Sequence, residues 1–199
     1  MILTFHIWKS LASSTNDCIL NIQFPSQRND SNCVQGNWGG FLEANCCVVP
    51  FDGYLHALGE RANKTGQIFL NMTEQVNCLA SMKTKQDDVL NCGIQKLTSG
   101  EGGCSDYSVI DVINKLENFE NMLEESCDLG SDDLSGEACG SCLRMWEEMG
   151  EKGEDDICRF AVLVTVTSRG IYEEKWIKEL YGCLQGQNRL SMGNGIHTF

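Results

Sequence analysis

The stretch FAVLVTVT, residues 160–167, decides the fold class of this chain of 199 residues. Its β-branched residues suit a β-strand, because branching at Cβ is well accommodated in a sheet. The stretch is also apolar all round, as a helix at the centre of a protein core is. Asp155 and Asp156 stand just before it and favour a helix N-terminus. Every other segment with a clear periodicity is helical, so a single strand would have no partner. We therefore predict a central buried helix.

Five further stretches carry apolar residues at helical spacing. They cover residues 51–63, 68–82, 109–123, 133–150 and 174–184. In the second of these, Val76 and Ala80 are among the residues expected to face the core. Ser108 and Asp111 have the spacing of a capping box, which predicts a helix start at residue 109. The expected fold is mainly α, a disulfide-stapled domain of about six helices.

The chain divides into three parts by composition. Residues 1–32 are polar and irregular, residues 33–184 form a cysteine-rich domain, and residues 185–199 are rich in Gly and Asn, as flexible linkers are. Lys9 follows the first apolar run instead of preceding it, which makes a poor signal peptide. No apolar run reaches the length of a membrane helix. These features suggest a piece of a larger protein.

The twelve cysteines indicate an oxidising compartment, because cytosolic thiols are kept reduced. They are Cys18, Cys33, Cys46, Cys47, Cys78, Cys92, Cys104, Cys127, Cys139, Cys142, Cys158 and Cys183. A bond between neighbouring Cys46 and Cys47 would be strained, so each is expected to pair elsewhere. Three glycosylation sequons, at Asn29, Asn63 and Asn71, agree with a secreted protein or the outer face of the plasma membrane.

Cys139 and Cys142 form a C-x-x-C, the spacing of thioredoxin-like redox sites. Such a site lies at a helix N-terminus after a strand, whereas here the motif lies within an amphipathic helical stripe. Two cysteines on one helix face can each reach a different neighbouring helix, which favours structural disulfides. A thiol-disulfide oxidoreductase remains the enzymatic alternative, and it requires a bond between these two residues.

Other chemistry finds little support in the sequence. A zinc site needs a second short cysteine or histidine pair, but His6, His56 and His197 are scattered. The acidic stretch 117–156 lacks the pattern of a calcium-binding EF-hand. No hydrolase, metalloprotease or phosphate-loop motif occurs. We therefore expect no catalytic residue, no metal and no cofactor.

The net charge of −13 argues against nucleic acid and against an anionic membrane surface as partners. Within the acidic stretch 117–156 we expect a solvated face and a helix cap, formed by Glu147, Glu148, Glu151, Glu154, Asp155 and Asp156. The alternative is a docking surface for a basic partner. Trp38 stands among glycines and is the one binding candidate. It is expected in the core, although it has the chemistry to stack on a sugar ring or anchor a partner.

An ordered series of cysteines with their neighbours resembles a known family. The series comprises Asn45-Cys46-Cys47, YLHALG at 54–59, CGIQKLTSG at 92–100, Gly103-Cys104-Ser105, CGSC at 139–142, Trp146, DICR at 156–159, Trp176 and YGCL at 181–184. It is similar to the SPARK domain, the cysteine-rich extracellular module of a group of plant receptor-like kinases. The resemblance runs from about Cys33 to Leu184.

The resemblance implies a type I membrane protein with a signal peptide, this ectodomain, one membrane helix and a cytoplasmic Ser/Thr kinase. Some family members act in symbiosis with mycorrhizal fungi. None of the kinase signatures is present in this chain, so no catalytic residue is carried over. The expected function is non-catalytic binding of an unknown extracellular ligand or co-receptor protein, with membrane attachment only through a segment absent from this chain. The alternative is a secreted or anchored structural protein without a kinase. An exposed apolar groove would favour binding, and scattered polar residues would favour the structural alternative.

Overall fold

The structure is a computed structural model that describes residues 17–23, 48–84, 93–100, 102–127, 136–151 and 156–184. Within these residues the chain is mainly α, as predicted, with seven α-helices and no sheet. The helices are α1 (Val48–Thr65), α2 (Met72–Lys83), α3 (Val109–Lys115), α4 (Glu117–Ser126), α5 (Gly136–Glu151), α6 (Asp156–Arg169) and α7 (Glu174–Leu184), with a 3-10 turn, η2, at Ile94–Lys96. In the part of the chain that the structure describes, β-type pairing is limited to two isolated bridges, Gln67 with Ser108 and Leu70 with Thr98.

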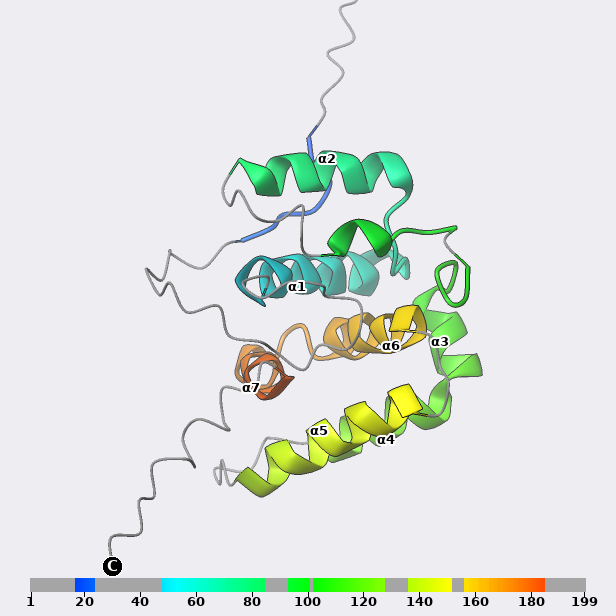
Figure 1. Cartoon of the computed structure of the whole chain (residues 1–199), viewed down its shortest axis with the longest axis vertical. Helices are drawn as coiled ribbons and strands as arrows, with labels where there is room; N and C mark the ends of the chain where they lie inside the picture. Colours follow the sequence, from blue (N-terminus) through cyan, green and yellow to red (C-terminus); the bar gives the residue numbers. More distant parts are fainter. Residues whose placement is uncertain are drawn as a thin grey trace, which may run out of the picture.

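The helices are stacked around α1 and α6, which have the most extensive contact of any helix pair (Figure 1). Figure 1 shows α2 on the outer side of α1, and α4 with α5 on the opposite side, beyond α6. A buried hydrogen bond of 2.7 Å from the Tyr54 hydroxyl of α1 to the Gln75 amide oxygen of α2 links α2 to the centre of the stack. The core is centred on α1 and α6 and also takes in buried side chains of α2, α4, α5 and α7.

Helix α6 is the central buried helix that the sequence predicts. All nine residues from Phe160 to Ser168 are buried. The hydroxyl of Thr165 donates to the carbonyl of Ala161 (2.9 Å), and that of Ser168 donates to the carbonyl of Thr165 (2.7 Å). Because a buried hydroxyl without a partner is costly, these bonds to the helix's own backbone let hydroxyl residues share the core with valines.

The close approach of α1 and α6 depends on Gly59. A Cβ atom at this position would stand 2.5 Å from Cγ2 of Thr167 on α6, closer than atoms can pack. Near the start of α1, Phe51 packs against Phe160 with ring centroids 6.2 Å apart. Phe69 adds a second aromatic contact to Phe160 at 5.7 Å. These contacts fix α1 along the length of the central helix.

The prediction for residues 68–82 was wrong about where the helix begins and only partly right about the buried residues, since Leu70 and Leu79 are buried as expected. Helix α2 starts at Met72, with a capping box between Asn71 and Glu74, because the residues before it are held extended by the two bridges. Its buried residues are Gln75, Cys78, Leu79 and Met82. Val76 is 56% exposed and Ala80 is exposed, so neither of these two predicted core residues faces the core.

The stretch 109–123 forms two helices instead of one, which is why the described part of the chain has seven helices and not about six. The capping box of Ser108 and Asp111 is present as predicted and starts α3. Leu116 departs from helical geometry, with φ −122° and ψ 21°, and separates α3 from α4. The break lets both short helices pack on α6, with the Leu116 side chain buried.

The stripes predicted for the last part of the chain are confirmed. On α5, five residues at helical spacing within 133–150 are at most 6% exposed: Cys139, Cys142, Leu143, Trp146 and Met149. On α7, four residues at helical spacing within 174–184 are at most 5% exposed: Ile177, Leu180, Tyr181 and Leu184. Trp176 is partly buried against the core and donates from its indole nitrogen to the carbonyl of Cys127 (2.9 Å).

Among the described residues, four disulfides connect elements that are far apart in the sequence. They are Cys18–Cys78, Cys104–Cys158, Cys127–Cys142 and Cys139–Cys183. The first attaches residues 17–23, which place Leu20 and Ile22 in the core, to α2. The remaining cysteines, Cys33, Cys46, Cys47 and Cys92, lie outside the described residues, as do the predicted tail 185–199 and most of the segment 1–32.

Candidate ligand-binding site

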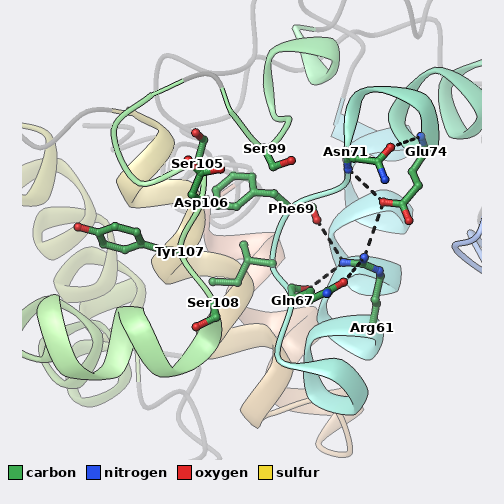
Figure 2. Close-up of a pocket in the computed structure, with 11 residues that line it drawn as sticks. Arg61, Gln67, Phe69, Asn71, Glu74, Ser99, Ser105, Asp106, Tyr107 and Ser108 are labelled. Carbon is green, nitrogen blue, oxygen red and sulfur yellow. Dashed lines mark hydrogen bonds and ion pairs between the residues drawn. The ribbon is translucent and has the colours of Figure 1, made fainter.

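A polar hollow of about 370 Å³ lies where α1, α2 and the loop before α3 meet. Eleven residues line it: Arg61, Gln67, Ile68, Phe69, Asn71, Glu74, Ser99, Ser105, Asp106, Tyr107 and Ser108 (Figure 2). Its volume is within the range of small-molecule sites, about 300–1,000 Å³. The hollow is therefore the first candidate for a functional site.

The floor of the hollow is built by three pieces of extended backbone. The chain leaves α1 through Gly66, whose φ of 73° is in the left-handed region that favours glycine. The segment that follows is then held on both sides. Val109 donates its amide to the carbonyl of Gly66 (2.9 Å), and Ser99 donates its amide to the carbonyl of Leu70 (2.9 Å). Backbone pairing thus brings residues 66–70, 98–99 and 108–109 together.

Arg61 closes one wall, and its guanidinium group is occupied by structural contacts. Nη1 donates to the carbonyls of Gln67 (3.1 Å) and Phe69 (3.2 Å), and Nη2 donates to Oε1 of Gln67 (2.6 Å). Nη2 also lies 3.7 Å from a carboxylate oxygen of Glu74. Figure 2 shows these contacts as dashed lines converging on Arg61. Both terminal nitrogens are thus engaged, so Arg61 positions the extended segment and is poorly placed to bind an anion.

The start of α2 forms the next wall. The side-chain oxygen of Asn71 accepts from the amide of Glu74, and Oε2 of Glu74 accepts from the amide of Asn71, both at 3.0 Å. The same Oε2 is the atom nearest to Arg61. The Glu74 carboxylate therefore serves the helix cap and the arginine together, and this combination fixes the angle between α1 and α2.

The loop 102–108 forms the opposite wall. The disulfide Cys104–Cys158 ties it to the first turn of α6, and Oδ1 of Asp106 accepts from the amide of Gly100 (3.0 Å). Beyond the loop, Lys115 at the end of α3 lies 4.4 Å from the centre of the Tyr107 ring and 2.9 Å from the Asp111 carboxylate. The hydrogen bond from the Ser108 hydroxyl holds the pKa of the Asp111 carboxyl well below its usual range, and Lys115 adds to this. The wall is therefore tied to α6 by a disulfide and to α3 by the contact of Tyr107 with Lys115.

Several groups that line the hollow make no hydrogen bond to another described residue. They include Nε2 of Gln67, Oγ of Ser99, Oγ of Ser105 and Oδ2 of Asp106. The first three of these are neutral and the last is a carboxylate oxygen, while both terminal nitrogens of Arg61 already have protein partners. A hollow of this kind offers both donors and acceptors without a free positive charge, which suits the hydroxyl groups of a neutral polar ligand better than an anion.

A second hollow, of about 470 Å³, lies beside the end of α6 and is lined by Glu124, Glu125, Arg169, Gly170, Glu173 and Trp176. Arg169 contacts the carboxylates of Glu120 (2.6 Å) and Glu124 (3.4 Å). Burial raises the pKa of the Glu124 carboxyl, and the Arg169 guanidinium opposes that shift. The Arg169 guanidinium is thus paired with two carboxylates of α4. Three of the six lining residues of this hollow are glutamates.

The structure separates the two cysteines of the C-x-x-C motif. Cys139 is bonded to Cys183 of α7, and Cys142 is bonded to Cys127 at the end of α4. The mutual bond that the oxidoreductase alternative requires is therefore not formed. This is the arrangement that the sequence favoured, in which two cysteines of one helix face reach two different neighbours.

Other predicted site residues are placed as follows. Asn63 and Asn71 are exposed, and Asn71 lies at the rim of the first hollow. Glu147 and Glu148 of the acidic stretch are exposed on α5. Asn29 and Trp38 lie outside the described residues. No cluster of metal-ligating side chains and no helix long and apolar enough to cross a membrane occur in the part of the chain that the structure describes.

The residues of the first hollow were missed by sequence reasoning. They come from α1, the extended segment, α2 and two loops, and each is of an ordinary surface type. The only local signal was the string CGIQKLTSG with Gly103-Cys104-Ser105, whose loops supply Ser99 and the wall at residues 102–108. A polar wall assembled from separate segments leaves no periodic pattern in the sequence.

The SPARK family model matches residues 12–159, from the first irregular segment to the first turn of α6. No curated protein and no solved structure matches the chain. The matched range contains every residue that lines the first hollow and stops before α7, which the Cys139–Cys183 disulfide nevertheless holds to α5.

Proposed function

The chain belongs to the SPARK family, and from this premise we propose that it is the extracellular, non-catalytic binding domain of a plant receptor-like kinase. We place its ligand site in the hollow beside Arg61. The ligand class that fits this hollow is a neutral, hydroxyl-rich molecule, that is, an oligosaccharide.

The disulfides support the extracellular part of the proposal. All four described bonds join separate elements, with 15 to 60 residues between partners, and every cysteine in the described ranges is bonded. Bonds of this kind form and persist in oxidising compartments. A receptor for cell-surface signalling meets its ligand in such a compartment.

The observation that carries the binding proposal is the pattern of occupied and unoccupied groups in the hollow. Both terminal nitrogens of Arg61 already donate to the protein itself, whereas Gln67, Ser99 and Asp106 keep groups free for a ligand. A hydroxyl group both donates and accepts, so a sugar satisfies amide, hydroxyl and carboxylate groups together. The three described hollows are lined mainly by polar residues, which gives an apolar co-receptor interface less support than a polar ligand.

The test is thermal unfolding of the disulfide-bonded domain with defined oligosaccharides. Protein is made in the bacterial periplasm, which oxidises cysteines and leaves Asn71 at the rim unmodified. Chitotetraose and cellotetraose serve as neutral probes, and tetragalacturonic acid serves as the anionic probe. At ten times Kd, binding stabilises by about 1.4 kcal/mol, which corresponds to a rise in Tm of roughly 3–6 °C. We expect this rise with a neutral probe and none with the anionic one.

The matched variants are Ser99→Tyr and Ser81→Tyr. Ser99 lines the hollow, so a tyrosine there fills it, whereas Ser81 is exposed near the other end of α2. The first variant is expected to lose the rise in Tm and the second to keep it. A domain that responds to none of the probes, or only to the anionic one, contradicts the proposed ligand class and favours the structural alternative. The kinase context is tested separately by reading the gene beyond Phe199 for a membrane helix and kinase signatures.

A further inference from the structure

Tyr172 is the most exposed large apolar side chain in the described part of the chain, at 83%. It lies in the short connection between α6 and α7, where the amide of Glu173 donates to the carbonyl of Gly170 (2.8 Å) and fixes the turn. Ile171 beside it is buried. The turn therefore fixes the backbone at Tyr172, whose side chain is open to solvent.

This exposed ring lies beside a glycosylation sequon. Asn63, in the last turn of α1, is exposed and starts the sequon Asn63-Lys64-Thr65. The Tyr172 hydroxyl donates to Oδ1 of Asn63 at 3.4 Å, although the two residues are 109 positions apart. The sequon and the ring are thus brought together only by the packing of α1 against α6.

The asparagine is placed so that modification leaves the fold intact. Nδ2 of Asn63 donates to the carbonyl of Ser168 (2.9 Å). This nitrogen carries two hydrogens, and glycosylation replaces only one of them. The other hydrogen remains available for the bond to Ser168, which joins the end of α1 to the end of α6.

A third hollow, of about 300 Å³, adjoins both residues. Its lining is His56, Glu60, Asn63, Lys64, Ile171, Tyr172 and Glu174. The lining combines an aromatic ring with side chains that donate to or accept from hydroxyl groups. The hollow therefore offers an aromatic side chain and polar groups next to Asn63.

We propose that Asn63 carries an N-linked glycan whose first N-acetylglucosamine stacks on the ring of Tyr172 and clamps the end of α1 to the α6–α7 connection. In the transfer, the bond between C1 of the sugar and its lipid pyrophosphate carrier breaks and a bond from C1 to Nδ2 forms. Nδ2 loses a proton and the lipid pyrophosphate leaves. The apolar face of the sugar then covers the aromatic ring, which removes apolar surface from water. The proposal rests on the extracellular part of the proposed function.

The experiment compares four proteins secreted from a eukaryotic host and trimmed with endoglycosidase H to a single N-acetylglucosamine: wild type, Asn63→Gln, Tyr172→Ala and the double variant. Peptide mapping is expected to find the sugar on Asn63. A stacked sugar stabilises by an amount typical of aromatic pairs, so Tyr172→Ala should lower Tm by about 2–4 °C in glycosylated protein. The same change is expected to lower Tm far less when Asn63→Gln is already present.

Tyr172→Phe is the matched control. It keeps the ring and removes the hydrogen bond to Asn63, so it should retain most of the difference between glycosylated and unglycosylated protein. Nitration of Tyr172 gives a second readout, since a stacked sugar should slow it. The proposal is overturned if Asn63 is unmodified in secreted, disulfide-bonded protein, or if Tyr172→Ala has the same effect with and without the sugar. A failure of the extracellular proposal would look different, because the cysteines themselves would remain reduced.

Discussion

At the scale of single residues, Glu120 is the most informative side chain outside the hollows. Its carboxylate is 1% exposed, yet no apolar pattern marks its position as buried. Arg169, which is 47% exposed, contacts it at 2.6 Å and reaches it from the far end of α6. A buried carboxylate is tolerated only when a partner compensates its lost hydration. The pair therefore joins α4 to the central helix.

Arg169→Ala is expected to destabilise the domain strongly, because it leaves the Glu120 carboxylate buried without its partner. The expected loss in free energy of unfolding is at the lower end of about 3–5 kcal/mol, since Arg169 is half exposed. Lys178→Ala is the control, because Lys178 and its partner Glu174 are each 79% exposed. That change should cost at most about 0.5 kcal/mol. Urea unfolding measures both, and equal midpoints for the two variants would contradict the role of the buried pair.

At the scale of elements, the helix starts show which local signals hold. The capping box of Ser108 and Asp111 was predicted from spacing and is present, because both partners and the helix behind them are local. The equivalent box of Asn71 and Glu74 was missed. The apolar residues just before it continue the periodicity, but backbone pairing with distant segments keeps them extended.

The capping box of α3 predicts a specific dependence of stability on pH. The hydrogen bond from Ser108, with Lys115, lowers the pKa of Asp111 in the folded state. The ionised carboxylate therefore contributes stability above the unfolded pKa of about 4, and this contribution is lost as the pH falls toward the lower folded value. In Asp111→Asn, the free energy of unfolding should be smaller at pH 7 and should decrease less on acidification.

Urea midpoints measured between neutral pH and pH 3 check this prediction. Lys115→Met provides the comparison, because it removes the smaller contribution to the lowered pKa and leaves the cap in place. It should give a curve between those of the wild type and Asp111→Asn. Parallel curves for all three proteins would show that the cap does not couple to the ionisation of Asp111.

At the scale of the whole molecule, the disulfides hold the outer helices to one another around α6. Helix α5 carries two of the bonds on one face, one to the end of α4 and one to α7. The bond Cys104–Cys158 fastens the wall of the first hollow to α6. Each disulfide closes a loop and so lowers the conformational entropy of the unfolded chain. This typically raises the free energy of unfolding by about 2–4 kcal/mol for each bond.

Peptide mapping without reduction tests this network directly. A protease that cuts after glutamate leaves Cys139 and Cys142 in one peptide and places Cys127 and Cys183 in two others. The structure predicts one complex of three peptides. A mutual bond between Cys139 and Cys142 would instead release their peptide alone, lighter by two hydrogens, and would restore the oxidoreductase alternative. Protein reduced before digestion is the control and should release all three peptides separately.

The sequence by itself determined the fold class, the family and the buried faces of the later helices. Each of these depends on local order: the spacing of apolar residues along α5 and α7, the apolar segment at 160–167, and the series of cysteines with their neighbours. Side chains three and four positions apart share a helix face whatever the rest of the chain does. The buried face of a helix can therefore be predicted from its own stretch of sequence.

Only the tertiary structure decided where the helices α2 and α4 begin, which cysteines are bonded and which polar groups meet. The start of α2 depends on pairing with residues near 98 and 108, and the partners of Cys139 and Cys142 depend on which helices flank α5. Likewise, Tyr172 meets Asn63 only because α1 packs along α6. Contacts between residues far apart in the chain follow from how the core closes, and their positions in the sequence carry no period that would reveal them.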